Sequence, residues 1–206
     1  RVWNVYFHTL FIVMDAKLIQ KQIDSGLIKT DILLSRAKHM DSSSKSAGDY
    51  NDVRYLPFYY HLGKQSSAKT VCQIGPKLGL VGACFLKSCE TVDSWTIVDN
   101  KHNNCQITTS NLKLNSNFYK KTFCDFVFYS TLDEIKSFYD ICFITESFEK
   151  TVCFNYMEFM WESLSSEGLL VVDYITSNNA FHEFCRVKNR EPMIFNTRYG
   201  VGIVQK

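Results

Sequence analysis

The sequence predicts an α/β fold in which a mostly parallel sheet of seven strands is covered by helices, with further helices at the N-terminal end and an antiparallel hairpin at the C-terminal end. Two observations predict it. From residue 70 onward, short apolar segments alternate with longer helical ones, and the apolar segments are nearly continuous, as in parallel strands buried on both faces. The last two apolar segments flank Tyr199 and Gly200, a pair that suits the turn of a hairpin.

Size and composition favour one soluble domain. A chain of 206 residues buries one sizeable core, and 46% hydrophobic with 21% charged residues is ordinary for a globular protein. The net charge of +2 is spread along the chain without a long basic run, so nucleic acid is not indicated as a partner. Several of the eight cysteines, such as Cys72, Cys124 and Cys142, lie in apolar segments, which predicts free thiols in a reducing, cytoplasmic compartment.

Residues 1–64 differ from the remainder. Residues 1–13 are apolar, too short to span a bilayer at ~20 residues, and we expect them to pack on the body or on a protein partner. Residues 15–40 have the spacing of amphipathic helices with a break near Gly26, and a polar loop follows at 41–53. We therefore expect residues 1–64 to be an extension with helices that pack on a domain formed by residues 65–206.

The elements of residues 65–206 follow from alternating apolar and amphipathic segments. The predicted strands cover residues 70–75, 95–99, 124–129, 140–144, 168–173, 193–197 and 200–204. The predicted helices cover residues 79–89, 103–114, 131–138, 148–164 and 178–188.

The segment VCQIGPKLGLVG, residues 71–82, carries the first chemical signal. Gly75 and Gly79 let the backbone turn sharply and approach a ligand. A helix that starts near Leu78 presents unpaired N–H groups to a carboxylate, and Asp99, at the end of the next strand, can accept hydrogen bonds from ribose hydroxyls. This placement indicates a ligand that contains a nucleoside, and a tight turn without a ligand remains the alternative.

The order of elements and this motif resemble the class I S-adenosylmethionine-dependent methyltransferases, a three-layer Rossmann-like fold. The Gly-x-x-x-Gly form is that of the small-molecule O-methyltransferase branch, and residues 167–173, EGLLVVD, are similar to the family's fifth strand. The resemblance implies S-adenosylmethionine as cofactor. The residues it implies in cofactor binding are Gln73, Gly75, Pro76, Lys77, Leu78, Gly79, Asp99 and Asn100.

The sequence departs from the family at two places. Gln73 stands where an acid helps to hold the methionine amino group, so the charge attraction is lost. At the positions where the catechol-type branch binds Mg²⁺, the chain has Thr145 followed by Glu146, and Asp173 followed by Tyr174. We therefore expect no metal, and we expect Glu146 and Asp173 to form the polar floor of a pocket and to be the candidate general bases, with helix capping or turn stabilisation as the alternative role.

Aromatic residues supply two further expectations. Tyr55, Phe58, Tyr59 and Tyr60 either cover the adenine or the acceptor, or form core beneath a helix, and Tyr174 is expected in the pocket. Two functions follow. The first is a methyltransferase for a small molecule, a sugar or a protein side chain. The second is a methyltransferase-like domain without catalysis, which serves as a structural or binding subunit of a larger assembly.

Overall fold

The computed structural model describes most of the predicted sheet and its covering helices. The described residues are 16–24, 55–76, 79–99, 108, 112, 125–129, 132, 135, 138–146 and 149–206. Several predictions fall outside them, namely those for residues 1–13, 41–53, Lys77, Leu78 and Asn100 and most of those for residues 103–114 and 131–138.

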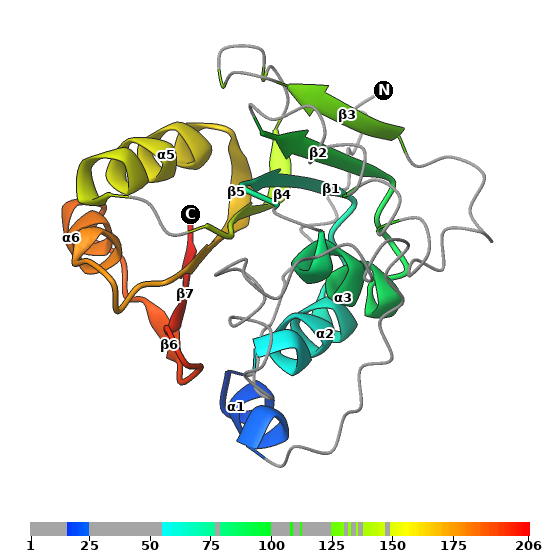
Figure 1. Ribbon diagram of the computed structural model, residues 1–206, viewed down its shortest axis with the longest axis horizontal. Coiled ribbons are helices and arrows are strands. Elements are labelled where there is room, and N and C mark those ends of the chain that lie inside the picture. Colours follow the sequence, from blue (N-terminus) through cyan, green and yellow to red (C-terminus); the bar gives the residue numbers. More distant parts are fainter. Residues whose placement is uncertain are drawn as a thin grey trace, which may run out of the picture.

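The strands form one seven-stranded sheet in the order β3-β2-β1-β4-β5-β7-β6 (Figure 1). Their bounds are β1 Thr70–Ile74, β2 Ser94–Val98, β3 Asp125–Tyr129, β4 Tyr139–Ile144, β5 Leu164–Asp173, β6 Met193–Phe195 and β7 Val201–Gln205. The pairs from β3 to β5 are parallel, whereas β7 pairs antiparallel with both β5 and β6. The predicted α/β fold with a mostly parallel sheet and a C-terminal antiparallel hairpin is confirmed.

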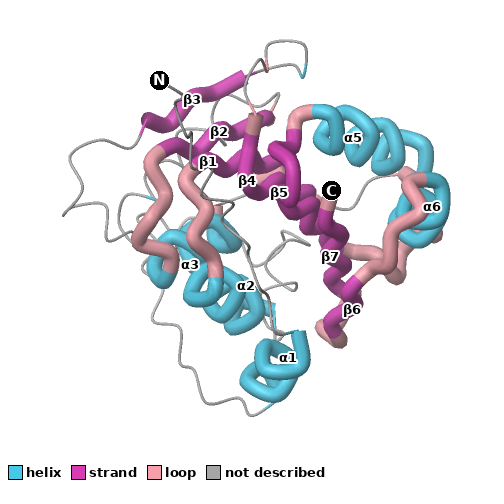
Figure 2. The backbone as a smooth tube through the Cα atoms, turned by 180° about the vertical axis from the view of Figure 1, so that it is seen from behind, coloured by secondary structure: helices cyan, strands magenta, loops and turns pink. Residues whose placement is uncertain are grey.

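Helices cover both faces of the sheet, which makes three layers (Figure 2). Helices α2 (Tyr55–Gln65) and α3 (Leu80–Ser88) lie on one face, and α1 (Ala16–Asp24) packs on α2. Helices α5 (Lys150–Glu162) and α6 (Ala180–Val187) lie on the other face. None of the described helices is long and apolar enough to cross a membrane.

Successive residues of a strand face opposite sides, so each buried strand feeds two cores. In β4, Ile141 and Phe143 pack in the core beneath α2 and α3, while Cys142 and Ile144 pack beneath α5 and α6. All four are fully buried, which explains the continuous apolar run in the sequence.

The change of helix layer locates the switch point of the sheet. The connection from β1 to β2 passes through α3 on one face, and the connection from β4 to β5 passes through α5 on the other. Strands β1 and β4 are neighbours, so the chain leaves their carboxyl ends in opposite directions. Open α/β sheets bind ligands in the crevice at such a point.

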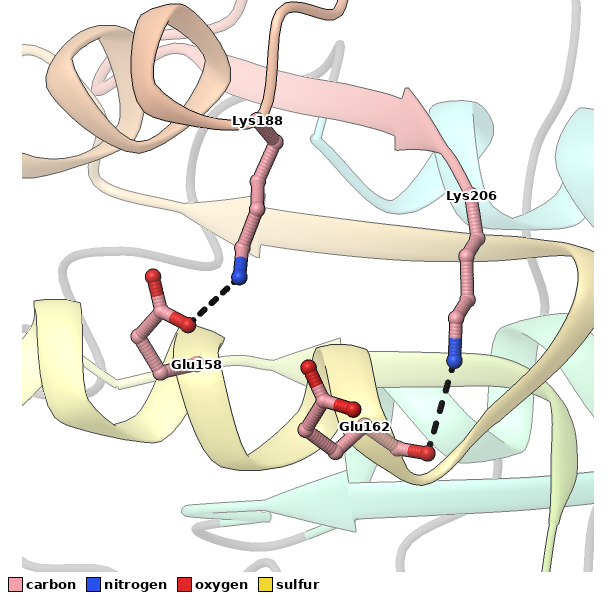
Figure 3. A network of polar contacts seen from close by, with 4 residues as sticks. All are labelled: Glu158, Glu162, Lys188 and Lys206. Atoms are coloured by element: carbon pink, nitrogen blue, oxygen red, sulfur yellow. Dashed lines mark hydrogen bonds and ion pairs between the residues drawn. The ribbon is translucent and has the colours of Figure 1, made fainter.

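Polar contacts join the elements of the α5 and α6 layer to each other and to the sheet (Figure 3). Lys188, after α6, pairs with Glu158 of α5 at 2.6 Å. Lys206, directly after β7, donates to the main-chain oxygens of Glu162 and Leu164 at 3.4 and 2.9 Å. Because helices leave their last carbonyls without partners, Lys206 stabilises the end of α5.

Some element boundaries differ from the predicted ones. Strand β5 begins at Leu164 rather than at residue 168, because Leu164 pairs with Tyr139 of β4 before a register shift. The sequence predicts a short helix after Pro57, whereas helix α2 begins at Tyr55, so that Pro57 lies in the first turn, where its missing N–H costs nothing. Strand β6 ends at Phe195 rather than at residue 197.

Candidate functional site

The glycine turn after β1 has the backbone that the sequence predicts. Gly75 has φ +66° and Gly79 has φ +75°, a left-handed region that disfavours residues with a Cβ. The Gly75 N–H donates to the Val98 oxygen of β2 at 3.2 Å, and the Gly79 N–H donates to the Pro76 oxygen at 2.7 Å. The turn therefore leads directly into α3, whose first N–H groups point back toward it.

Side-chain space at this turn is already taken by neighbours. A Cβ on Gly75 would lie 2.6 Å from the Cβ of Glu146, and a Cβ on Gly79 would lie 2.9 Å from Cγ2 of Thr108. Both distances are shorter than real Cβ contacts. The two glycines are thus required by the close approach as well as by their φ angles.

Asp99 lies beside the glycine turn. Residues Ile74 and Val98 are partners in the parallel pair of β1 and β2, so Gly75 and Asp99 follow directly after paired positions. Asp99 is half-buried. The structure therefore brings the glycine bend and the aspartate to the same edge of the sheet, as the sequence predicts.

A buried polar link connects β1 with the end of β4. The fully buried Gln73 donates from Nε2 to Oγ1 of Thr145 at 2.9 Å, and this hydroxyl donates to the Gly75 oxygen at 2.8 Å. The Thr145 N–H also donates to the Ile74 oxygen at 3.1 Å. The supporting role of Thr145 was not predicted, although its position directly after β4 was a signal.

One polar atom of Gln73 has no hydrogen-bond partner among the described residues. Its Oε1 is buried and accepts no hydrogen bond from the described residues. It lies on the α3 side, 3.2 Å from where a Cβ on Gly82 would be. Buried carbonyls are rarely left unpaired, so this atom is available to a donor that enters beneath the turn.

Glu146 is exposed and lies against the turn from the side of β4. Its Oε2 would be 2.9 Å from a Cβ on Gly75, which places the carboxylate over that glycine. Glu146 forms no hydrogen bond or ion pair within the part of the chain that the structure describes.

Asp173, expected with Glu146 in the polar floor of a pocket, lies in buried surroundings. It is 3% exposed, and its carboxylate accepts hydrogen bonds from the hydroxyls of Tyr55 and Tyr59, both on α2. Burial, and next the Asp173 carboxylate, raise the pKa of Tyr59 well above its ordinary value, so this tyrosine keeps its proton. The structure thus separates buried Asp173 from exposed Glu146, and the two expected candidate bases have different surroundings.

The aromatic residues of α2 are core. Tyr55, Phe58 and Tyr59 are buried, and Phe58 contacts Phe195 at 4.8 Å between ring centroids. The prediction that this cluster forms core is confirmed for these three residues, whereas Tyr60, the fourth member, is half-buried. Tyr174, expected in the pocket, is buried with φ +60° and stacks on Tyr199 at 5.1 Å.

The side chains at the positions where the catechol-type branch binds Mg²⁺ are a poor ligand set for a metal. In the described ranges, no three His, Cys, Asp or Glu side chains come together as ligands. The carboxylate of Asp173 is taken by two phenols, and Tyr174 offers no carbonyl oxygen in its side chain. The residues therefore do not fit the Mg²⁺ site of the catechol-type branch.

A separate small cavity of about 110 Å³ lies at the opposite edge of the sheet, where Lys69, Asp140 and Gly168 are among its lining residues. Asp140 accepts hydrogen bonds there from the N–H groups of Lys69 and Thr70 at 2.8 and 3.0 Å. These contacts pair β1 with β4 at their amino ends, away from the glycine turn.

The chain has the fold of solved methyltransferases, among them structures with SAH or SAM bound. The chain is similar to the SAH-bound methyltransferase PaMTH1 of Podospora anserina, with TM-score 0.61 and 10% identity over 93% of this chain and 88% of that one. It is also similar to the O-methyltransferase TomG of Streptomyces achromogenes, solved with SAM, with TM-score 0.55 and 11% identity over 98% and 94%.

A methyltransferase of Geobacter sulfurreducens gives TM-score 0.61 and 16% identity over 74% of this chain and 78% of that one. At such identities the shared property is the fold. Neither a family model nor a curated protein matches the chain.

Proposed function

We propose that this protein is a methyltransferase that uses S-adenosylmethionine. The observation that carries the proposal is the adjacency of the Gly75 bend and Asp99 at the carboxyl ends of β1 and β2, beside the switch point between β1 and β4. A ligand that lies across this edge meets a close backbone on β1 and a carboxylate on β2. An extended molecule with an adenosyl group and an amino-acid end suits both.

The residues of the turn fit this cofactor. Gly75, Pro76 and Gly79, together with Lys77 and Leu78, would hold the methionine part, and the first N–H groups of α3 would receive its carboxylate. Asp99 and Asn100 would hold the ribose. Oε1 of Gln73, which has no hydrogen-bond partner among the described residues, would accept a hydrogen bond from the ligand or from a water molecule between them.

Catalysis in this site is alignment more than acid-base chemistry. The bound cofactor supplies a sulfonium methyl that is already electrophilic, so the chain has to orient the acceptor in line with it and exclude water. The carboxylate of Asp173 accepts hydrogen bonds from Tyr55 and Tyr59, so its part in this site would be to hold α2 against the end of β5.

The remaining parts of the proposal concern the acceptor and the setting. We propose a small molecule, a sugar or a protein side chain as acceptor, with the N-terminal helices and residues 41–53 shaping access to it and residues 1–13 available to a protein partner. A cytoplasmic location is supported by the free, buried thiols of the described cysteines, among them Cys72, Cys84 and Cys142.

Calorimetric titration with S-adenosylmethionine tests the proposal. The wild type should bind at micromolar concentration, and Asp99→Ala should weaken binding at least about tenfold, because a charge-assisted hydrogen bond is lost. Asp93→Ala is the matched control, since Asp93 is exposed at the other end of β2. If the folded wild type gives no binding heat at millimolar S-adenosylmethionine, an active enzyme is refuted, and a structural or binding subunit is the function that remains.

A further inference from the structure

Two carboxylates flank the glycine turn from opposite sides. Strand β1 lies between β2 and β4 in the sheet, so Asp99 stands on the β2 side of Gly75 and Glu146 on the β4 side. Contact geometry places Oε2 of Glu146 directly over Gly75. A ligand that spans the carboxyl end of β1 would therefore meet an acid at each side.

The two acids suit two different groups of one ligand. If Asp99 receives the ribose hydroxyls, the amino-acid end of the same molecule extends over Gly75 toward β4. That end carries an ammonium group, and a desolvated ammonium needs anionic or carbonyl acceptors.

Other groups near this end are neutral or engaged. The amide of Gln73 carries no charge, and its Nε2 donates to Thr145. The carboxylate of Asp173 accepts from Tyr55 and Tyr59. Within the described part of the site, Glu146 is the acid over Gly75 that has neither a hydrogen bond nor an ion pair.

We propose that Glu146 binds the ammonium group of the cofactor's methionine part and so supplies the negative charge that Gln73 lacks. This proposal rests on the proposed function. It assigns Glu146 to cofactor binding in place of the general-base role expected from the sequence, because an ammonium that stays charged through the reaction contributes to affinity and takes no part in the chemical step.

Binding of three ligands to four proteins tests the assignment. The ligands are S-adenosylmethionine, S-adenosylhomocysteine and 5′-methylthioadenosine, and the third has no amino-acid end. The proteins are the wild type, Glu146→Gln, Glu146→Asp and Glu149→Gln. Glu149 is the matched control, because it is exposed three positions further on, at the start of α5, and its side chain makes no capping hydrogen bond.

Glu146→Gln should weaken S-adenosylmethionine and S-adenosylhomocysteine by about the same factor, about tenfold, because both keep the ammonium. Its affinity for 5′-methylthioadenosine should stay within about twofold of wild type, and Glu149→Gln should change none of the three. Glu146→Asp keeps the charge and should retain more affinity for the two amino-acid ligands than Glu146→Gln.

The proposal is overturned if Glu146→Gln binds all three ligands as the wild type does, or if it weakens all three equally. Equal losses in Glu146→Asp and Glu146→Gln would also overturn it, because charge would then not matter. Failure of the wild type to bind S-adenosylmethionine is a different result, which refutes the proposed function itself.

Discussion

The contact between α2 and the end of β5 gives the sharpest prediction on stability. Tyr59→Phe removes the hydroxyl that donates to Asp173 and leaves the ring in place. The ring keeps its contacts with Phe58 and Phe143, at 4.9 and 5.7 Å between centroids. The substitution therefore isolates one buried hydrogen bond with little change in packing.

The expected loss follows from burial and charge. Tyr59 is fully buried and Asp173 is 3% exposed, so water does not replace the lost donor. A hydrogen bond to a charged group contributes ~1.5–3 kcal/mol, and we expect the free energy of unfolding to fall by about 2 kcal/mol. For a chain of this size that corresponds to a lower Tm by roughly 4–8 °C.

Urea unfolding followed by circular dichroism measures this change, and Tyr60→Phe is the control. Tyr60 is the next residue, half-buried, and its ring contacts His61. Its hydroxyl makes no hydrogen bond with the described residues, so removal should change stability by less than about 0.5 kcal/mol.

A double-mutant cycle of Tyr59→Phe with Asp173→Asn identifies the partner. The two changes should be non-additive by more than about 0.5 kcal/mol, because both remove the same hydrogen bond. If Tyr59→Phe is as stable as Tyr60→Phe, or if the cycle is additive, the phenol does not stabilise the fold through Asp173.

Three further predictions concern the turn, the pH dependence and the surface. Gly75→Ala should lower the free energy of unfolding, measured by urea titration, by at least ~1–2 kcal/mol. The reason is that Gly75 has φ +66° and that the new Cβ would lie 2.6 Å from Cβ of Glu146. Unchanged stability would contradict this geometry. The raised pKa of Tyr59 means that the folded state keeps a proton that the unfolded state loses above pH ~10. The free energy of unfolding of the wild type, measured relative to Tyr59→Phe by urea titration, should therefore fall between pH ~9 and pH ~11. An increase over this range would refute the raised pKa. Lys188→Met should lower the free energy of unfolding by less than about 1 kcal/mol, because its partner Glu158 is partly exposed. This loss should be smaller in about 1 M salt, and a loss that salt does not change would show that the ion pair is not its cause.

The sheet could be predicted from sequence because burial on both faces leaves a local signal. The continuous apolar runs of β1, β4 and β5 and the glycine turn each lie within a few consecutive residues. The early start of β5 could not be predicted in this way. Residues 165–168, Ser-Ser-Glu-Gly, have the composition of a loop, and only the pairing of Leu164 with Tyr139 extends the strand.

The site was predictable in its backbone and less so in its acids. Gly75 and Asp99 follow adjacent strands, and their meeting is a direct result of parallel pairing. Asp173 also follows a strand, and the same reasoning predicted that it forms the polar floor of a pocket together with Glu146. Its actual partners, Tyr55 and Tyr59, precede it by 118 and 114 residues, and no local pattern reports a contact of that kind.

These long separations have a consequence during synthesis. Helix α2 leaves the ribosome more than a hundred residues before the strand that carries its carboxylate partner, and such distant contacts form late and slowly. Until translation reaches Asp173, the aromatic face of α2, with Phe58 and Tyr59, has no complete sheet to cover. Nascent chains that stop short of β5 should therefore be the species that chaperones capture, and the finished chain should not.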